Sequence, residues 1–160
     1  MSDKPKYPVT SATTLLDKEG VTYGKHLYDY LKKGAAVAAE QLGVDNHIMI
    51  KTLVMQRENG EPLIILMHGD REVSLKELAR QAGAKSIQTC DPSEAQRHTG
   101  YMVGGISPFG TKKQLPVYAE EEILGLPRIW INGGQRGFIL DMDPADLVRV
   151  LKPKPVKVAR

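Results

Sequence analysis

The chain has 160 residues, of which 41% are hydrophobic and 26% are charged, and its formal net charge is +3. This length and composition indicate one globular domain and exclude a disordered or collagen-like chain. The positive excess lies at the two ends: residues 152–160 carry four basic side chains and no acid, and residues 7–151 carry a net charge of −2. The folded body is therefore not a polycationic binder of nucleic acid.

Segments with helical and strand-like patterns alternate along the chain. Asn59-Gly60 between two apolar runs is a strong hairpin signal, and capping residues such as Ser74 and Asp91 mark the starts of helices. In chain order, we predict a helix over residues 10–18, a strand over 21–30, a helix over 35–42, a hairpin of strands over 47–56 and 62–68, a helix over 74–81, a strand over 86–89, a helix that opens at residue 91, an ordered loop over 99–116, strands over 128–131 and 137–142, and a last helix over 143–151.

This mixture of hairpins and helices predicts an α+β (mixed α/β) fold, with a curved, barrel-like mixed sheet and surrounding helices. Residues 1–151 form the expected domain. Residues 152–160, in which Lys and Pro alternate, are expected to form an extended or disordered basic tail that stays out of the core. The sequence has neither a secretory signal nor an apolar run long enough to cross a membrane, so we expect a cytoplasmic protein.

Several familiar catalytic patterns fail. Residues 105–112 nearly match a phosphate-binding loop, but Lys and Thr stand in the wrong order and no helix follows. Ser107 lacks the glycine two residues later that a nucleophile elbow requires. The four histidines stand far apart in the sequence, so a metal site would have to be assembled entirely by the fold, and we expect none. Cys90, the single cysteine, is interpreted as a small buried hydrophobe.

Lys51 is a charged residue inside an apolar strand. Alternation places it on one face with Met49, Leu53 and Met55, so it either snorkels to an edge or lines a pocket. In a pocket, the ammonium would suit an anionic or carbonyl-bearing ligand.

Two glycine pairs, Gly104-Gly105 and Gly133-Gly134, stand in the second half of the chain. Such a pair lets the backbone approach a ligand and present N–H groups to an oxyanion, although it could equally form a tight structural turn. The segments around both pairs and around Lys51 contain basic but no acidic residues, which favours an anionic ligand.

Three segments together resemble the YbaK family: residues 50–53, residues 95–110 and residues 133–137. Its members are bacterial Cys-tRNA(Pro) deacylases, related to the editing (insertion) domain of prolyl-tRNA synthetase, and the similarity extends over nearly the whole chain. It implies the YbaK/prolyl-tRNA synthetase editing-domain fold and hydrolysis of the ester that links a wrong amino acid to tRNA, with no cofactor and no metal. The implied partners are the acceptor end of mischarged tRNA and prolyl-tRNA synthetase, with no membrane and no DNA.

The resemblance also assigns roles to individual residues. Lys51 would bind the terminal phosphate or ribose rather than act as a base, and backbone N–H groups near Gly104 would hold the ester carbonyl. The thiol of a cysteinyl substrate would attack its own ester, so no protein nucleophile is required. The implied substrate-binding residues are His26, Tyr28, Thr52, Gly105, Ile106, Ser107, Pro108, Gly133, Gly134, Arg136 and Ile139.

Ile139 departs from the family pattern, because the relatives carry an acid at this place. By alternation Asp141 shares its face and could partly substitute. Three hypotheses therefore stay open: a Cys-tRNA(Pro) deacylase, a deacylase for another small amino acid such as alanine on tRNA(Pro), and a non-catalytic module that binds tRNA ends or nucleotides. The basic tail has no catalytic duty in any of them, and its deletion is expected to spare hydrolysis.

Overall fold

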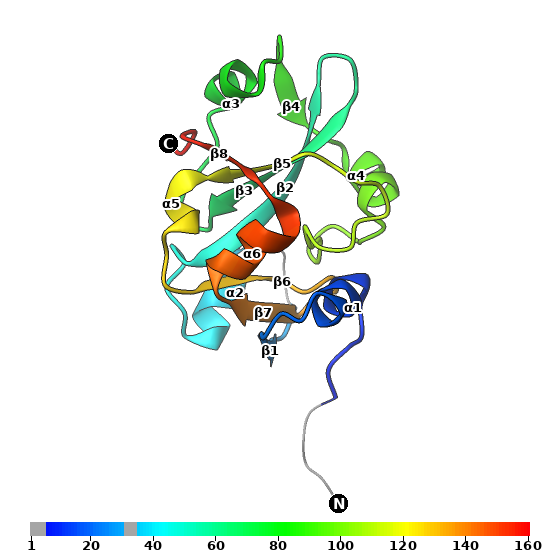
Figure 1. Cartoon of the computed structure of the whole chain (residues 1–160), viewed down its shortest axis with the longest axis vertical. Helices are drawn as coiled ribbons and strands as arrows, with labels where there is room; N and C mark the ends of the chain where they lie inside the picture. The colour runs from blue at the N-terminus through cyan, green and yellow to red at the C-terminus, as the bar shows by residue number, and fades with distance from the viewer. Residues whose placement is uncertain (1–5, 31–34) are drawn as a thin grey trace, which may run out of the picture.

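The computed structural model describes residues 6–30 and 35–160, and Figure 1 shows their arrangement. Residues 1–5 and 31–34 of the predicted domain lie outside the described residues. The helices are α1 (Ser11–Lys18), α2 (Ala35–Leu42), α3 (Leu75–Ala82), α4 (Pro92–Thr99), α5 (Glu121–Leu124) and α6 (Pro144–Leu151). The strands are β1 (Gly24–Leu27), β2 (Met49–Arg57), β3 (Pro62–His68), β4 (Ile87–Thr89), β5 (Val117–Glu120), β6 (Ile129–Asn132), β7 (Phe138–Met142) and β8 (Lys154–Val156).

Local capping signals account for the helix ends. Thr10 begins α1 with reciprocal hydrogen bonds: its Oγ1 accepts from the Thr13 N–H at 3.1 Å, and its N–H donates to the Thr13 Oγ1 at 2.9 Å. Ser74 Oγ accepts from the Glu77 N–H at 3.2 Å at the start of α3, which ends at Gly83 with a φ of 70°. The predicted starts of α1 and α3 are confirmed.

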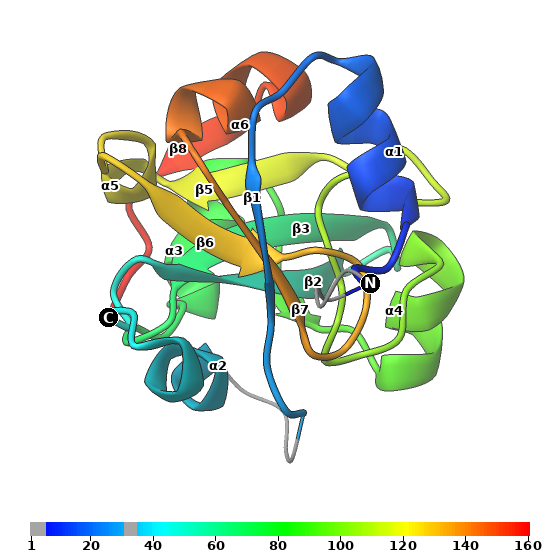
Figure 2. The ribbon, with the colours of Figure 1, turned by 90° about the horizontal axis from the view of Figure 1, so that it is seen from below.

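Eight strands form one mixed sheet in the described part of the chain, in the order β1-β7-β6-β2-β3-β5-β8, with β4 paired to β2 off this path. The β2–β3 hairpin is antiparallel, as predicted, whereas the β2–β6, β3–β5 and β5–β8 pairs are parallel. Figure 2 shows β1 and β7 running across the direction of β2 and β3, so the sheet turns strongly along its length. The predicted mixed α/β fold with a curved sheet is confirmed.

One edge of β2 is shared by two short strands. β6 pairs with Met49 and Ile50 at its beginning, and β4 pairs with residues 55–57 at its end. Between them, residues 51–54 have no strand partner on this edge within the described ranges. The sheet is therefore open over the centre of β2.

The central strands are covered on both faces. In β3, Ile64 and Leu66 pack into a cluster that includes residues of α1, α4, α5 and α6, whereas Leu63, Ile65 and Met67 pack toward α3. All five side chains are at most 1% exposed. A strand buried on both faces reads as one continuous apolar run, which is why the sequence predicts this strand correctly.

Residues 152–160 do not stay out of the core, so that prediction is wrong. β8 extends the sheet beside β5, and Val156 and Val158 are 2% and 1% exposed in the cluster with α3. The Glu120 carboxylate accepts the N–H groups of Val158 and Ala159 at 2.8 and 3.0 Å. Proline is tolerated at a sheet edge, and the two valines alternate with exposed lysines, so the segment is an edge strand.

Two elements, β5 and α5, are not predicted from the sequence, and each contains four residues. Elements this short carry little periodicity to detect. The ordered loop predicted over residues 99–116 does connect α4 to β5. Among the residues described, no helix is long and apolar enough to cross a membrane.

Candidate active site

A cleft of about 380 Å³ opens where the edge of β2 is free. The middle of β2 forms its floor, Ala38 and Ile139 stand on the side of α2, and Pro92 and Ala95 stand on the side of α4. Its volume and mostly apolar wall are those of a site for a small organic group. The lining residues are Tyr28, Ala38, Met49, Ile50, Lys51, Thr52, Leu53, Val54, Thr89, Cys90, Pro92, Ala95, Val103, Gly104, Ile106, Asn132 and Ile139.

Thr52 presents polar groups to this cleft. The Ile48 carbonyl accepts from the Trp130 N–H at 2.9 Å and the Val54 carbonyl accepts from the Cys90 N–H at 3.2 Å, so even-numbered residues point their backbone to this edge. Thr52 is the even-numbered residue between Ile50 and Val54, in the gap, so its N–H and C=O face the cleft. Its Oγ1 is also buried without a hydrogen-bond partner among the described residues. Unsatisfied groups of this kind are candidates for contacts with a ligand.

Lys51 lies at the rim of the cleft with 19% of its side chain exposed. Its Nζ donates to the Arg71 carbonyl at 2.6 Å and lies 3.7 Å from the exposed carboxylate of Glu72. An ammonium has three N–H groups, and the carbonyl takes one of them. The loop after β3 therefore anchors the ammonium at the edge of the pocket, where it can still bind a ligand.

Gly104 lines the cleft with a φ of 99°, in the left-handed region that favours glycine. A Cβ at this position would overlap the Tyr30 hydroxyl. The Gly105 N–H donates to the Met102 carbonyl at 3.0 Å, whereas no hydrogen-bond partner of the Gly104 N–H is found within residues 6–30 and 35–160. Gly104 can therefore offer this N–H to a ligand.

The second glycine pair forms a structural turn. A Cβ at Gly133 would lie 2.6 Å from Cδ2 of Phe138, and one at Gly134, whose φ is 99°, would lie 2.8 Å from Cε1 of Tyr101. Neither glycine lines the cleft. Close packing against the core explains this pair.

Arg136 joins the second glycine loop to the first. Its Nε donates to the Val103 carbonyl at 2.8 Å, and its guanidinium lies over the Tyr30 ring at 5.2 Å. A Cβ at Gly105 would lie 2.6 Å from the Arg136 backbone nitrogen, so the two loops approach closely there. Arg136 positions the cleft loop from outside.

The cleft collects six of the thirteen residues to which the sequence analysis gave a site role: Tyr28, Lys51, Thr52, Gly104, Ile106 and Ile139. Burial raises the pKa of Tyr28, so its phenol stays protonated. The seven others lie outside its lining: His26, Gly105, Ser107, Pro108, Gly133, Gly134 and Arg136. Ser107 is fully buried, and its Oγ accepts from the Phe109 N–H at 3.1 Å in a tight turn.

His26 belongs to an ion group with Asp141 and Arg128. Its Nε2 lies 2.6 Å from Asp141 Oδ1, Arg128 donates to Oδ2, and the His26 ring packs 4.3 Å from Trp130. Burial acts to raise the pKa of Asp141, but the bonds from His26 and Arg128 outweigh it and hold that pKa below its usual value. Asp141 is therefore committed to this group and, unlike Ile139, does not line the cleft.

Asn132 and Cys90 line the cleft but had no site role in the sequence analysis. Asn132 ends β6 and directly precedes a glycine pair. This position in the sequence is the signal that could have identified it as a candidate site residue. Cys90 is 6% exposed, as predicted for a buried hydrophobe. Burial, with smaller effects from Glu94 and Asp91, raises the pKa of its thiol, so it stays protonated near neutral pH.

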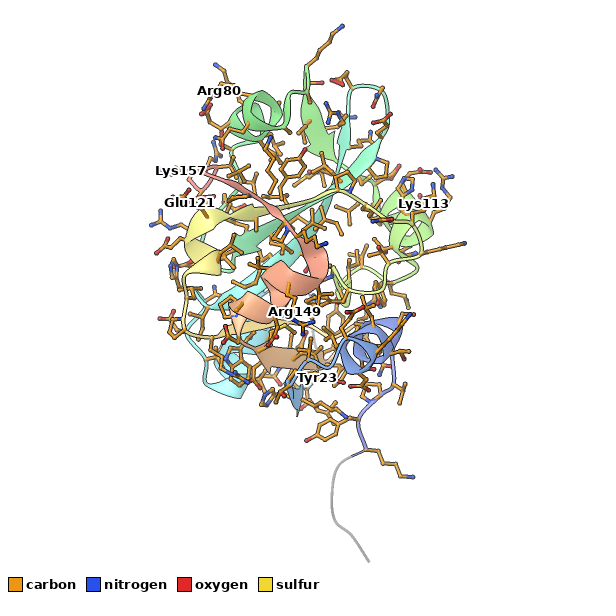
Figure 3. The ribbon with its side chains drawn as sticks, viewed as in Figure 1. Tyr23, Arg80, Lys113, Glu121, Arg149 and Lys157 are labelled. Carbon is orange, nitrogen blue, oxygen red and sulfur yellow. The ribbon has the colours of Figure 1, made fainter. Side chains whose placement is uncertain are left out.

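The segments around Lys51 and the two glycine pairs contain no acidic residue in sequence, but some of their basic side chains have partners in the folded structure. Arg97 pairs with Glu94 one turn earlier on α4, and the Lys113 Nζ lies 3.1 Å from the His98 Nδ1. Lys112 and Lys113 are exposed on the loop that includes Gly104, and Figure 3 shows Lys113 on the outside of the molecule. These two lysines keep the cleft loop locally positive.

Residues able to hold a metal ion gather elsewhere. In the part of the chain that the structure describes, one such group is found: His47, His68 and Glu122, none of which lines the cleft. Two of the histidines that stand apart in the sequence, His47 and His68, are thus stacked on each other by the fold.

Comparison with known proteins places the chain in one family. Residues 32–150 match the family of aminoacyl-tRNA editing domains. A candidate Cys-tRNA(Pro)/Cys-tRNA(Cys) deacylase of Enterococcus faecalis, EbsC, is 30% identical over 146 residues, which are 90% of this chain and 89% of that protein. The proline–tRNA ligase of Maridesulfovibrio salexigens is 31% identical over 75% of this chain, but the match covers only 19% of the ligase.

A solved structure of a candidate trans-editing enzyme for prolyl-tRNA synthetase has the same fold, with a TM-score of 0.83 at 24% identity over 96% of this chain and 99% of that one. The expected editing-domain fold is thereby confirmed. The family match spans most of the sequence and includes β2 and both glycine loops. The chain therefore belongs to the YbaK/aminoacyl-tRNA editing domain family.

Proposed function

We propose that this protein is a trans-editing deacylase that hydrolyses the ester of a mischarged aminoacyl-tRNA, with Cys-tRNA(Pro) as its preferred substrate. The observation that carries the proposal is the convergence on one small cleft of Lys51, of Thr52, whose Oγ1 has no partner among the described residues, and of Gly104 in the left-handed region. The aminoacylated 3′ end of tRNA offers matching groups: a phosphate, ribose hydroxyls and an ester carbonyl. The similarity to EbsC supports the choice of cysteine.

In the proposed reaction, water adds to the ester carbonyl, and the N–H at Gly104 stabilises the oxyanion. The bond to the ribose oxygen then breaks, this oxygen takes a proton from the attacking water, and the free amino acid leaves. A cysteinyl ester can instead be attacked by its own thiol: the carbon–sulfur bond forms, the bond to the ribose oxygen breaks, this oxygen takes the thiol proton, and a cyclic thioester leaves, which water hydrolyses to cysteine. Neither route needs a protein nucleophile. Lys51 binds the negative end of the substrate as a compact cation.

We also propose that the reaction is metal-independent. Among the described residues, the cleft lining includes neither a histidine nor a carboxylate, the usual ligands of catalytic divalent ions. The polar groups that it does contain can bind and orient an ester. Chelation of divalent ions is therefore expected to leave turnover within a few fold of its starting value.

A second candidate substrate is Ala-tRNA(Pro). Ile139, where the family resemblance leads us to expect an acid, is 2% exposed in the lining and packs with Ala38 and Met49. This wall is apolar, so it suits the methyl group of alanine as well as a thiol.

We further propose that prolyl-tRNA synthetase selects the tRNA. The cleft is large enough for the acceptor end only, and the matched ligase contains a similar segment within a much longer chain. The isolated protein is expected to hydrolyse the same acyl group from tRNA(Pro) and from other tRNAs at similar rates. Strong discrimination by the isolated protein would contradict this partner.

The test of the function is amino acid release from Cys-, Ala-, Ser- and Pro-charged tRNA(Pro). Wild-type protein is expected to release cysteine fastest, and Lys51→Ala is expected to be slower by about 100-fold or more, because a charged contact is lost in a confined site. Lys76→Ala, an exposed lysine of α3, is the matched control and should be unchanged.

Equal rates for wild type and Lys51→Ala would remove Lys51 from the site. Fastest release of alanine would select the second substrate. Binding of an aminoacyl-adenosine analogue without turnover on any of the four tRNAs would favour a non-catalytic module instead.

A further inference from the structure

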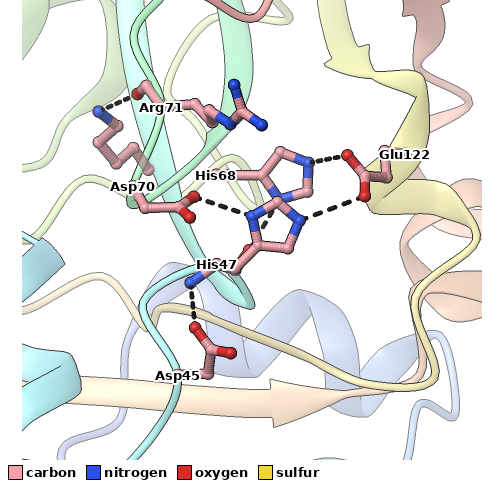
Figure 4. A network of polar contacts seen from close by, with 7 residues as sticks. Asp45, His47, His68, Asp70, Arg71 and Glu122 are labelled. Atoms are coloured by element: carbon pink, nitrogen blue, oxygen red, sulfur yellow. Dashed lines mark hydrogen bonds and ion pairs between the residues drawn. The ribbon is translucent and has the colours of Figure 1, made fainter.

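Two histidine rings and a carboxylate meet beside the end of β3, away from the cleft (Figure 4). His47 precedes β2, His68 ends β3 and Glu122 lies in α5. The two imidazole rings are stacked, with centroids 3.9 Å apart and planes 4° apart. Both rings present Nε2 to Glu122, at 3.3 Å for His47 and 3.5 Å for His68.

The other ring nitrogens identify where the protons are. His68 Nδ1 lies 2.7 Å from the His47 carbonyl, which only accepts hydrogen bonds, so Nδ1 carries a proton. His47 Nδ1 lies 2.9 Å from the Asp70 carboxylate and is a donor for the same reason. In the neutral tautomers, both Nε2 atoms therefore carry lone pairs.

In these neutral tautomers three acceptors face one another, and the 3.3 Å contact between His47 Nε2 and Glu122 Oε1 is a hydrogen bond only when that nitrogen carries a proton. His68 is 0% exposed, and its Nε2 has no hydrogen-bond partner within the described ranges. Two lone pairs directed at a carboxylate repel it unless a bound cation or a proton on the ring nitrogen lies between them. The ligand atoms of His47, His68 and Glu122 lie within 4.8 Å of one another, so one ion can contact all three after small movements.

We propose that His47, His68 and Glu122 bind a divalent transition-metal ion, for which Zn²⁺ is the best probe. Two imidazole nitrogens and one carboxylate are ligands for Zn²⁺ rather than for Ca²⁺ or Mg²⁺. The Glu122 side chain is 63% exposed, so a fourth position is open to water. The His47 side chain is 25% exposed, so its ring is not fully enclosed by the protein.

The surroundings of the two rings match this role. A metal-binding histidine usually donates its second N–H to a carboxylate or a backbone carbonyl, which fixes the tautomer. His47 does so to Asp70, and His68 does so to the His47 carbonyl. Both of these outer contacts are already in place.

The ion would brace the loop that anchors the cleft lysine. Asp70, which contacts His47, is followed by Arg71, whose carbonyl accepts from Lys51 at 2.6 Å (Figure 4). The ion adds no group to the cleft, so its role is structural. It is therefore compatible with metal-independent hydrolysis.

The test is Zn²⁺ titration of the metal-free 160-residue chain in competition with a chromophoric chelator. We expect one Zn²⁺ per chain and a higher melting temperature with Zn²⁺ bound. Glu122→Gln should weaken Zn²⁺ binding at least about tenfold, and Asp70→Asn by about 10- to 100-fold. Glu121→Gln is the matched control, because this exposed neighbour lies outside the group and should bind Zn²⁺ like wild type.

Circular dichroism of each variant checks folding, and Glu122 is exposed enough that Glu122→Gln is expected to fold. Imidazole ¹⁵N spectra of the wild type supply a second readout, in which Zn²⁺ should shift the Nε2 resonances of His47 and His68. The proposal is overturned by three results: no stoichiometric binding, equal affinity in Glu122→Gln and wild type, or both rings doubly protonated at neutral pH and unaffected by Zn²⁺. In the last case, protons on the two Nε2 atoms supply the positive charge beside the Glu122 carboxylate, and no metal ion is required.

Discussion

The cleft over β2 and the ion group around Asp141 both contact β7, through residues two positions apart. Their polar groups differ in whether they have hydrogen-bond partners. Ile139 faces the cleft, where Thr52 Oγ1 lacks a partner among the described residues. Asp141 is fully engaged, with His26 on one oxygen and Arg128 on the other. Both regions are expected from the sequence to take part in the site, because alternation places Ile139 and Asp141 on one face.

This difference in hydrogen-bond partners indicates which polar groups are available to a substrate. A buried polar group that already has its partners stabilises the fold, and removing one partner leaves a costly orphan. A buried polar group without a partner lowers stability and is kept where it meets a ligand. Variants of partnered groups should therefore reduce stability, and variants of unpartnered groups should reduce activity. The four predictions that follow test this rule, from the largest expected effect to the smallest.

Deletion of residues 152–160 should produce the largest effect. It exposes the sites of Val156 and Val158, each of which contributes about 1.5–3 kcal/mol by burial, and it removes both N–H donors to Glu120. We expect the free energy of unfolding to fall by about 4 kcal/mol or more in urea denaturation. Lys157→Gln, which removes only an exposed charge, is the control. An unchanged urea midpoint would restore the view that this segment is a dispensable tail.

Gly104→Ala should nearly abolish deacylation. The variant forces a Cβ into the left-handed region and against the Tyr30 hydroxyl, which displaces the N–H that we assign to the ester carbonyl. We expect the rate to fall about 100-fold or more, because misplacing a catalytic group by about 1 Å has this effect. Gly125→Ala, where φ is −100° and the nearest atom is 3.8 Å away, should be neutral. Normal turnover by Gly104→Ala would exclude the glycine from the site.

Asp141→Asn should reduce stability and spare activity. Because the folded pKa of Asp141 lies below its ordinary value of 3.8, its ionised form stabilises the protein above that pH, and this contribution is lost as the pH falls through the folded pKa. We expect a loss of about 1–3 kcal/mol at pH 7, and the difference from wild type should shrink below pH 3.8. Chemical denaturation at a series of pH values measures it. A variant of normal stability that no longer deacylates would place Asp141 in the chemistry.

Thr52→Val should have the smallest effect. The direction in which it changes stability is the sharpest test of the difference between partnered and unpartnered polar groups. The variant removes a buried hydroxyl without a partner among the described residues, so the melting temperature should stay the same or rise. Deacylation should slow by about 3- to 10-fold, the value of one hydrogen bond of about 0.5–1.5 kcal/mol. Thr14→Val on the exposed side of α1 is the control. A clear loss of stability would show that the Thr52 hydroxyl has a structural partner.

Local signals in the sequence determined much of the fold. The Asn59-Gly60 hairpin formed, and α1 and α3 began at their predicted caps, because such signals act over a few neighbouring residues. The alternation of Val156 and Val158 was also present, but their Lys and Pro neighbours indicated a disordered tail. Only the free edge of β5 in the folded sheet decided that this segment joins the core.

The candidate site divides in the same way. The sequence by itself singled out Lys51 as a charge in an apolar strand and Gly104 as part of a glycine pair, and family resemblance added Thr52; all three line the cleft. The two glycine pairs could not be told apart from sequence, because a ligand cradle and a close-packed turn both need glycine. The tertiary structure made the distinction by placing Gly133 and Gly134 against core side chains.

Contacts between segments distant in the sequence were decided by the tertiary structure alone. No local pattern links His47 to His68 or either one to Glu122, because strand pairing and the placement of α5 bring them together. The same holds for the opening over β2, which exists because β6 and β4 each cover only part of one edge. Sequence patterns report on neighbours along the chain, so they predicted the elements and the lysine, whereas the cleft and the histidine pair depend on how those elements meet.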